Sequence, residues 1–167
     1  QLPSEYSVIV FGLRWPRIVL GILVGAALSV AGTGFQALLR NPLADPYVLG
    51  VSSGAALGAI ISLIASPQFP LVTPLAAFLG AALTIAAVYL LGQREGQLDS
   101  GTLLLAGIIS ASFLSAVIMF LMTTLAGRDL RGMAFWLMGD LSTPLPAGLR
   151  WIFLAGLLGA VAAIYTT

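Results

Sequence analysis

The chain has 167 residues, of which 59% are apolar and only 8% are charged. A typical soluble domain carries about 25% charged residues, whereas the mean hydropathy of this chain is +1.06. So few charges do not cover the surface of a water-soluble protein of this length. The composition therefore indicates an integral membrane protein.

Three residue types are absent from the sequence, namely Cys, His and Lys. Without Cys there is no disulfide, thiolate nucleophile or iron–sulfur ligand, and without His the usual general base and metal ligand are missing. Without Lys there is no phosphate-binding loop ending in Gly-Lys-Ser/Thr. The net charge of +1, with no basic cluster, argues against a nucleic-acid partner. We therefore expect no enzyme and no cofactor, and any ATP must be bound by another chain.

Five apolar segments follow one another along the chain. The first has 22 residues between Arg17 and Arg40. As a helix it is about 33 Å long, enough to cross a hydrocarbon core of about 30 Å. Because lipid offers the backbone no hydrogen-bond partners, each segment should be a helix. The prediction is an all-α, polytopic transmembrane bundle in a single domain over residues 1–167. Its five membrane helices span residues 18–39, 48–65, 71–91, 102–125 and 149–165.

Two smaller features complete the expected architecture. A short interfacial helix is predicted near residues 129–138, within the longest connection between apolar segments. Gly50, Gly54 and Gly58 recur every four residues, a spacing that lets helix backbones approach closely in lipid. These glycines predict a compact bundle and carry no information about a substrate.

A polar stripe follows one face of the first segment. Ser29, Thr33, Gln36 and Arg40 are spaced by four, three and four residues, which places them on the same side of a helix. Such a stripe is costly against lipid, so it should face either neighbouring helices or a water-filled path. Both readings stay open, and Gln36 is the strongest candidate for lining a path because it is the largest polar group inside any segment.

The sequence offers little support for catalysis by a serine or a carboxylate. Residues 50–54 match the pattern of a nucleophile elbow, but that site needs a His partner, which the chain lacks. All the acidic residues lie in connections or at segment ends, which weighs against a proton- or ion-coupled carrier with a buried acid. These acids are Glu5, Asp45, Glu95, Asp99, Asp129 and Asp140.

The arginines give a first prediction of topology. If connections alternate across the membrane, residues 1–17, 66–70 and 126–148 share one side. With Arg150 at the edge of the fifth segment, that side carries five arginines, at positions 14, 17, 128, 131 and 150, and the other side carries only Arg40 and Arg94. By the positive-inside rule, the N-terminal side would be cytoplasmic.

Several motifs in order resemble a known family. They are Leu13–Arg17 (LRWPR), Gly25–Leu28 (GAAL), Gly32, Gln36, Arg40–Pro46 (RNPLADP), Leu49–Gly50, Leu103–Gly107 (LLLAG) and Phe135–Gly139 (FWLMG). The sequence resembles the permease subunits of bacterial ABC importers for iron–siderophore, haem and vitamin B12, the FecCD-like transport system permeases. The resemblance covers essentially the whole chain. Because such permeases have about twice as many membrane helices, the chain resembles a part that lacks the first helix and the second half.

The resemblance implies roles for particular residues. It places residues 1–17 outside the cytoplasm, against the arginine count, and matches Arg14 and Arg17 to positions that dock the substrate-binding protein. It places Asn41, Pro42 and Leu43 at a cytoplasmic gate, with Ser100 near the partner constriction. The substrate path would follow Ser29, Thr33 and Gln36.

The resemblance also implies a function. We expect a multi-pass subunit of the bacterial inner membrane that imports a metal chelate, with iron(III)-siderophore favoured because the family handles it most often. Its partners would be a second permease subunit, cytoplasmic ABC ATPase chains, a periplasmic or lipid-anchored binding protein, and membrane lipid. Two alternatives stay open: an ion- or proton-coupled carrier that uses an acid such as Asp45 or Asp140, and a membrane scaffold that transports nothing.

Overall fold

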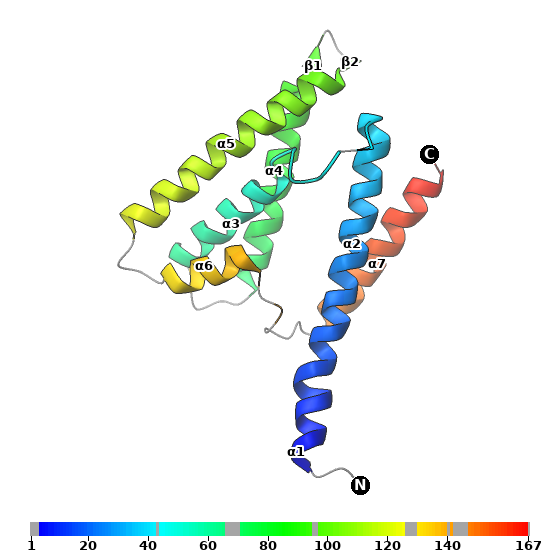
Figure 1. Ribbon diagram of the computed structural model, residues 1–167, viewed down its shortest axis with the longest axis vertical. Coiled ribbons are helices and arrows are strands. Elements are labelled where there is room, and N and C mark those ends of the chain that lie inside the picture. Colours follow the sequence, from blue (N-terminus) through cyan, green and yellow to red (C-terminus); the bar gives the residue numbers. More distant parts are fainter. Residues whose placement is uncertain are drawn as a thin grey trace. The chain divides into compact units, whose positions relative to one another are not determined.

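The computed structural model describes residues 4–42, 44–65, 71–94, 97–125, 130–139, 141 and 147–166. It contains two compact units, one formed by Gln1–Pro42 with Asp140–Thr167 and the other by Leu43–Gly139. The described elements are helices apart from one two-stranded hairpin (Figure 1). All five apolar segments contain a helix, so the all-α prediction is confirmed.

The first unit contains one long helix with a second helix beside it. Helical backbone runs from α1 (Ser4–Ser7) through the π-helical segment η1 (Val8–Arg14) into α2 (Trp15–Leu39), and α7 (Ala147–Thr166) packs against α2. The apolar stretch Val8–Leu39 alone has 32 residues. At 1.5 Å per residue this is about 48 Å, which exceeds a hydrocarbon core of about 30 Å. One end of this helix therefore projects beyond the membrane core.

The long helix begins well before residue 18, where the sequence predicted its start. The backbone N–H of Trp15 donates to the carbonyl oxygen of Val10, five residues earlier. The next residue, Pro16, has no N–H, and its ring would clash with the carbonyl four residues before it in a regular α-helix. A wider turn with five-residue hydrogen bonds lets the chain continue through this proline as a helix.

The second unit is built on α3 (Val51–Ala65) and α4 (Val72–Leu91), which are in direct backbone contact. A Cβ on Gly54 would lie 2.7 Å from the carbonyl oxygen of Gly80, and a Cβ on Gly58 would lie 2.9 Å from the carbonyl carbon of Ala76. Side chains do not fit at such distances. The predicted close packing at Gly54 and Gly58 is therefore confirmed, because only glycine lets the two helices approach so closely.

Residues 46–50 form turns instead of the first turn of α3. The N–H of Val48 donates to the carbonyl oxygen of Asp45 at 3.0 Å, and the N–H of Gly50 donates to that of Tyr47 at 3.1 Å. Gly50 has a φ of +74°, in the left-handed region that glycine tolerates. The helix consequently begins at Val51, three residues later than predicted.

This turn segment packs on α5 (Ser100–Thr124) at Gly107. A Cβ on Gly107 would lie 2.7 Å from the carbonyl oxygen of Val48 and 2.8 Å from the Cα of Leu49. Leu49 is only 4% exposed. Non-helical backbone at membrane depth is tolerated where protein buries it, and here α5 supplies that cover.

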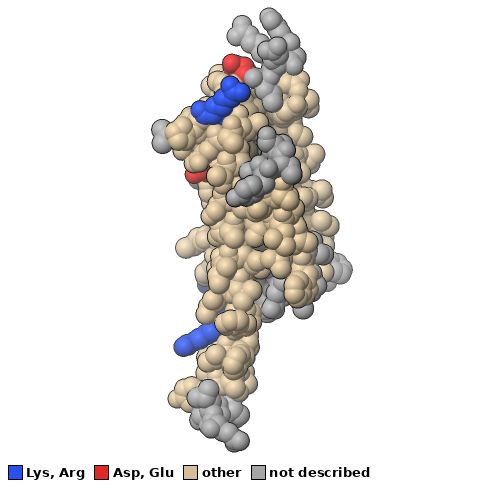
Figure 2. Space-filling view, turned by 90° about the vertical axis from the view of Figure 1, so that its right-hand side faces the viewer, with Lys and Arg blue, Asp and Glu red and all other residues tan. Residues whose placement is uncertain are grey.

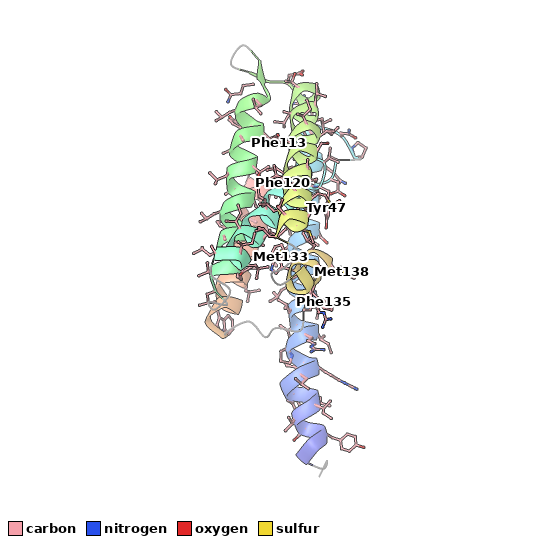
Figure 3. The ribbon with its side chains drawn as sticks, turned by 90° about the vertical axis from the view of Figure 1, so that its left-hand side faces the viewer. Tyr47, Phe113, Phe120, Met133, Phe135 and Met138 are labelled. Atoms are coloured by element: carbon pink, nitrogen blue, oxygen red, sulfur yellow. The ribbon has the colours of Figure 1, made fainter. Side chains whose placement is uncertain are left out.

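Short elements link and cover the helices of the second unit. The antiparallel strands β1 (Gln93–Arg94) and β2 (Gln97–Leu98) connect α4 to α5. The helix α6 (Leu130–Met138) lies where a short helix was predicted and packs against α3. Met133 of α6 is 1% exposed, whereas Phe135 and Met138 are exposed (Figure 3).

The described surface is largely apolar. Three described helices are long and apolar enough to cross a membrane, namely Val8–Leu39, Val72–Leu91 and Ser100–Thr124, and Val51–Ala65 is a shorter apolar helix. Large side chains such as Leu83 and Phe113 are about 70% and 68% exposed. On the face shown in Figure 2, charged side chains are few and uncharged residues make up nearly all of the described surface. Such a surface suits lipid and helix neighbours, not water.

Candidate functional site

The C-terminal end of α2 is closed by a tight turn at the position of the predicted gate. Arg40 has a φ of 48°, in the left-handed region, and its N–H donates to the carbonyl oxygen of Ala37 at 3.2 Å. The N–H of Asn41 donates to the carbonyl oxygen of Gln36 at 3.1 Å. This pair of bonds is a Schellman motif, which reverses the chain directly after the helix.

The side chain of Gln36 adds a third bond to this turn. Its Nε2 donates to the carbonyl oxygen of Pro42 at 2.9 Å. The structure thus brings three predicted site residues together, Gln36 with Asn41 and Pro42. The remaining residue predicted for this gate, Leu43, lies outside the described residues.

The other members of the polar stripe bond within their own helix. The hydroxyl of Ser29 donates to the carbonyl oxygen of Gly25 at 2.8 Å, and the hydroxyl of Thr33 donates to that of Ser29. Both residues are exposed. Because the helix itself satisfies their hydroxyl donors, Ser29 and Thr33 need no partner on another helix, and the choice between lining a path and facing a neighbour stays a prediction.

Arg14 and Arg17 lie on the long helix and not in a loop. Arg14 ends η1 and Arg17 belongs to the first turn of α2, and both are exposed. Residues three apart on a helix are neighbours on its surface. The backbone positions of the two arginines are therefore set by one continuous helix, and both exposed side chains are within reach of an acidic partner.

Ser100 is the first residue of α5 and lies in the second unit. Asp99 caps this helix, because its carboxylate accepts from the N–H of Thr102 at 2.7 Å and from the Thr102 hydroxyl at 2.6 Å. Ser100 is exposed. Sequence reasoning missed the cap, although Asp followed by Thr before an apolar run is a helix-start signal.

The second unit also contains an open groove between α3, α4 and α5, of about 530 Å³. Its lining is apolar apart from a few hydroxyls, and the hydroxyl of Thr84 already donates to the carbonyl oxygen of Gly80. The groove suits hydrocarbon or another helix and offers few groups to a polar chelate. Residues of the lining include Leu57, Ile61, Leu79, Leu83, Phe113 and Leu114.

Metal-binding clusters are not found in the part of the chain that the structure describes. Among these residues no three acidic side chains gather closely enough to hold an ion, and the sequence has no His or Cys.

Known proteins resemble this chain along its whole length. The model of the FecCD transport family matches residues 1–167. The chain is 41% identical over 150 residues to the cobalamin import system permease protein BtuC of Halobacterium salinarum, a match that covers 90% of this chain and 39% of that protein. It is 37% identical over 141 residues to the Fe(3+)-citrate import system permease protein YfmE of Bacillus subtilis, covering 84% of this chain and 42% of YfmE.

A solved structure extends the likeness to the fold. A chain of a structure titled as an inward-facing conformation of a putative metal-chelate type ABC transporter superposes on this chain with a TM-score of 0.76 at 27% identity, covering 95% of this chain and 50% of the other. The chain thus spans about half the length of the proteins it matches, or less. With its apolar helices, it is a multi-pass membrane protein. The match over its whole length shows that the chain belongs to the FecCD transport family.

Proposed function

We propose that the chain is part of the permease of an ATP-driven importer for metal chelates in the cytoplasmic membrane. The observation that carries this proposal is the family match over residues 1–167. The TM-score of 0.76 to a metal-chelate type ABC transporter supports it. Residues 1–167 would form part of one permease domain, which agrees with a structural likeness that covers 50% of the matched chain.

Iron(III)-siderophore is the cargo that we favour, and haem and cobalamin are its competitors. The two relatives described above are named for cobalamin and for Fe(3+)-citrate, which are both metal complexes with organic ligands. A path lined by a few hydroxyls on α2, at Ser29 and Thr33, would let such a complex pass without holding it tightly. The chelate keeps its metal, so the chain needs no metal ligands of its own.

The chain would work with other subunits. It has no Lys and so no phosphate-binding loop, which agrees with ATP hydrolysis on separate cytoplasmic chains. A second permease subunit would complete the path, and a binding protein that delivers the chelate would dock at Arg14 and Arg17. The chain itself would be no enzyme, because opening of the path is a rigid-body movement driven from the ATPase.

The first test is transport by the full-length permease, assembled with its ATPase and binding protein in liposomes. Uptake of a ferric siderophore, ferric citrate, haem or cyanocobalamin that requires ATP supports the proposal, and the compound taken up fastest identifies the cargo. Uptake that requires a proton or sodium gradient and no ATP would identify a secondary carrier. No uptake of any of the four, by an assembly that still hydrolyses ATP, would overturn the chelate assignment.

A second test fixes the orientation of the chain. Because these 167 residues contain no Cys, single cysteines at positions 14 and 45 give site-specific labelling, provided that other cysteines of the full-length protein are first replaced. An impermeant maleimide is added to intact cells. Labelling at 14 and not at 45 supports an outer docking site and an inner gate. The reverse pattern would follow the arginine count and overturn both assignments.

A further inference from the structure

The turn after α2 depends on one side chain. Gln36 lies in the last turn of α2 and makes two hydrogen bonds to residues beyond the helix. Its backbone carbonyl oxygen accepts from the N–H of Asn41 at 3.1 Å, and its side-chain Nε2 donates to the carbonyl oxygen of Pro42 at 2.9 Å. These bonds join backbone and side chain of one residue to two consecutive residues of the turn. Gln36 therefore sets the direction in which the chain leaves the helix.

The chemistry of Pro42 makes the side-chain bond important. Proline has no N–H, so its carbonyl is the only backbone hydrogen-bonding group with which it can be held. Arg40, two residues earlier, is in the left-handed conformation that non-glycine residues rarely adopt. The turn thus contains a strained residue, Arg40, followed by Pro42, whose backbone has only its carbonyl for hydrogen bonding. Gln36 donates to that carbonyl.

The other polar residues of the stripe do not share this role. The hydroxyls of Ser29 and Thr33 donate to carbonyls one turn earlier in α2. Gln36 donates forward, across the end of the helix, to a residue six positions later. One of its two amide hydrogens is thus bonded to the protein backbone.

We propose that Gln36 is a positioning residue that latches the Asn41–Pro42 turn in the arrangement seen in this structure, through the bond from Nε2 to the Pro42 carbonyl. The proposal rests on the proposed function, because it takes this turn as part of the cytoplasmic gate. A movement of the gate that displaces Pro42 would break the bond, and re-forming it would return the turn to one defined position. Gln36 then acts on transport through Pro42 and not through contact with the chelate.

Three substitutions separate a latch from a residue that lines a path. Gln36→Glu keeps the shape of the side chain but has no N–H to donate at neutral pH, and Gln36→Leu keeps similar bulk without polarity. Gln36→Lys retains a donor on a flexible stem. If Gln36 is a latch, Gln36→Glu and Gln36→Leu should have the same effect, and Gln36→Lys should retain function. If Gln36 lines a path, the hydrated Glu and the apolar Leu should affect transport differently. Ser29→Ala is the matched control, because it removes a polar group of the same stripe that does not touch the turn.

The first measurement is hydrogen exchange in the full-length protein in lipid nanodiscs. With Gln36→Glu and Gln36→Leu we expect the backbone amides of residues 40, 41, 44, 45 and 47–50 to exchange about tenfold faster, one factor of ten for the loss of one stabilising bond. Gln36→Lys and Ser29→Ala should exchange like the wild type. Unchanged exchange in Gln36→Glu, or equally fast exchange in Gln36→Lys, would overturn the latch.

The second measurement is leakage of ferric citrate and cyanocobalamin from liposomes that contain the assembled importer without nucleotide. A latch predicts that Gln36→Glu and Gln36→Leu raise leakage several-fold and equally. Faster exchange without extra leakage would overturn the role in gating. If the wild type transports neither compound with ATP, the transport proposal fails for them while the exchange data still decide whether Gln36 holds the turn.

Discussion

Gly54 of α3 and Gly80 of α4 face each other so closely that a Cβ on Gly54 would lie 2.7 Å from the carbonyl oxygen of Gly80. In lipid no hydrophobic effect drives two helices together, so close contact of this kind is a principal source of their affinity. The pair of small residues therefore determines the packing of the second unit.

Gly54→Ala is accordingly expected to destabilise the protein. The added methyl group has to push α4 away, which costs about 1–3 kcal/mol for overpacking. The free energy of unfolding is measured by titration with a denaturing detergent from mild micelles. Gly25→Ala in α2 is the control, because no atom lies within 4 Å of a Cβ at that position. It should be neutral or gain up to about 1 kcal/mol from helix propensity, and equal losses in both variants would contradict the packing argument.

A buried hydroxyl pair adds to the same interface. Ser62 of α3 and Thr73 of α4 are 4% and 7% exposed, and their hydroxyl oxygens are 3.0 Å apart. We expect Thr73→Val and Ser62→Ala each to cost about 0.6–2 kcal/mol, the range measured for hydrogen bonds between membrane helices. A double-mutant cycle isolates the bond. Costs that simply add would show that the two hydroxyls do not interact.

The sequence predicts the helices well because the length of an apolar run is a strong signal in a membrane protein. It predicts their ends less well, for local reasons. Pro16 suggested a loop, but a π-helical turn carries the helix through it. Residues 48–50 look like helix by composition, but a glycine with positive φ ends the turn segment at residue 50.

The candidate site was also predicted only in part from the sequence. Periodicity placed Gln36 on the polar face of α2, but it could not show that the amide reaches Pro42 around the end of the helix. Nor could it show that the turn segment containing Leu49 packs on Gly107, 58 residues further along. Such pairs depend on how the chain reverses between elements, which residue patterns within one element do not encode.

The strain at Arg40 gives a prediction about the turn. An L-residue in the left-handed region costs about 1–2 kcal/mol, and glycine does not incur this cost. Arg40→Gly should therefore raise the free energy of unfolding by about 0.5–1 kcal/mol after the greater freedom of glycine in the unfolded chain is deducted. Arg40→Val should lower it, because a β-branched residue fits this region worst. Arg40→Ala separates loss of the guanidinium from the backbone effect, and a glycine variant no more stable than alanine would contradict the prediction.

The cap of α5 gives a fourth stability test. The carboxylate of Asp99 accepts from the N–H and the hydroxyl of Thr102. Removing such a cap costs about 1 kcal/mol, so Asp99→Ala should destabilise the protein by that amount and speed amide exchange over residues 100–104. Asp99→Asn keeps an acceptor oxygen and should behave nearly like the wild type. A loss as large in Asn as in Ala would assign the effect to charge and not to capping.

The last prediction concerns the binding protein. Arg14 and Arg17 are exposed on a continuous helix, so they can present two fixed positive charges to acidic groups of a partner. Arg14→Glu combined with Arg17→Glu should weaken association of the binding protein with the assembled importer by tenfold or more. The loss should be greater at low salt, because screening of exposed charges increases with ionic strength. Arg131→Glu is the matched control: Arg131 is also an exposed arginine, on α6, and carries no docking assignment. A titration that finds the same affinity for the double variant and the wild type would remove the docking role. Equal weakening by Arg131→Glu would show that overall charge, and not the spacing of Arg14 and Arg17, controls association.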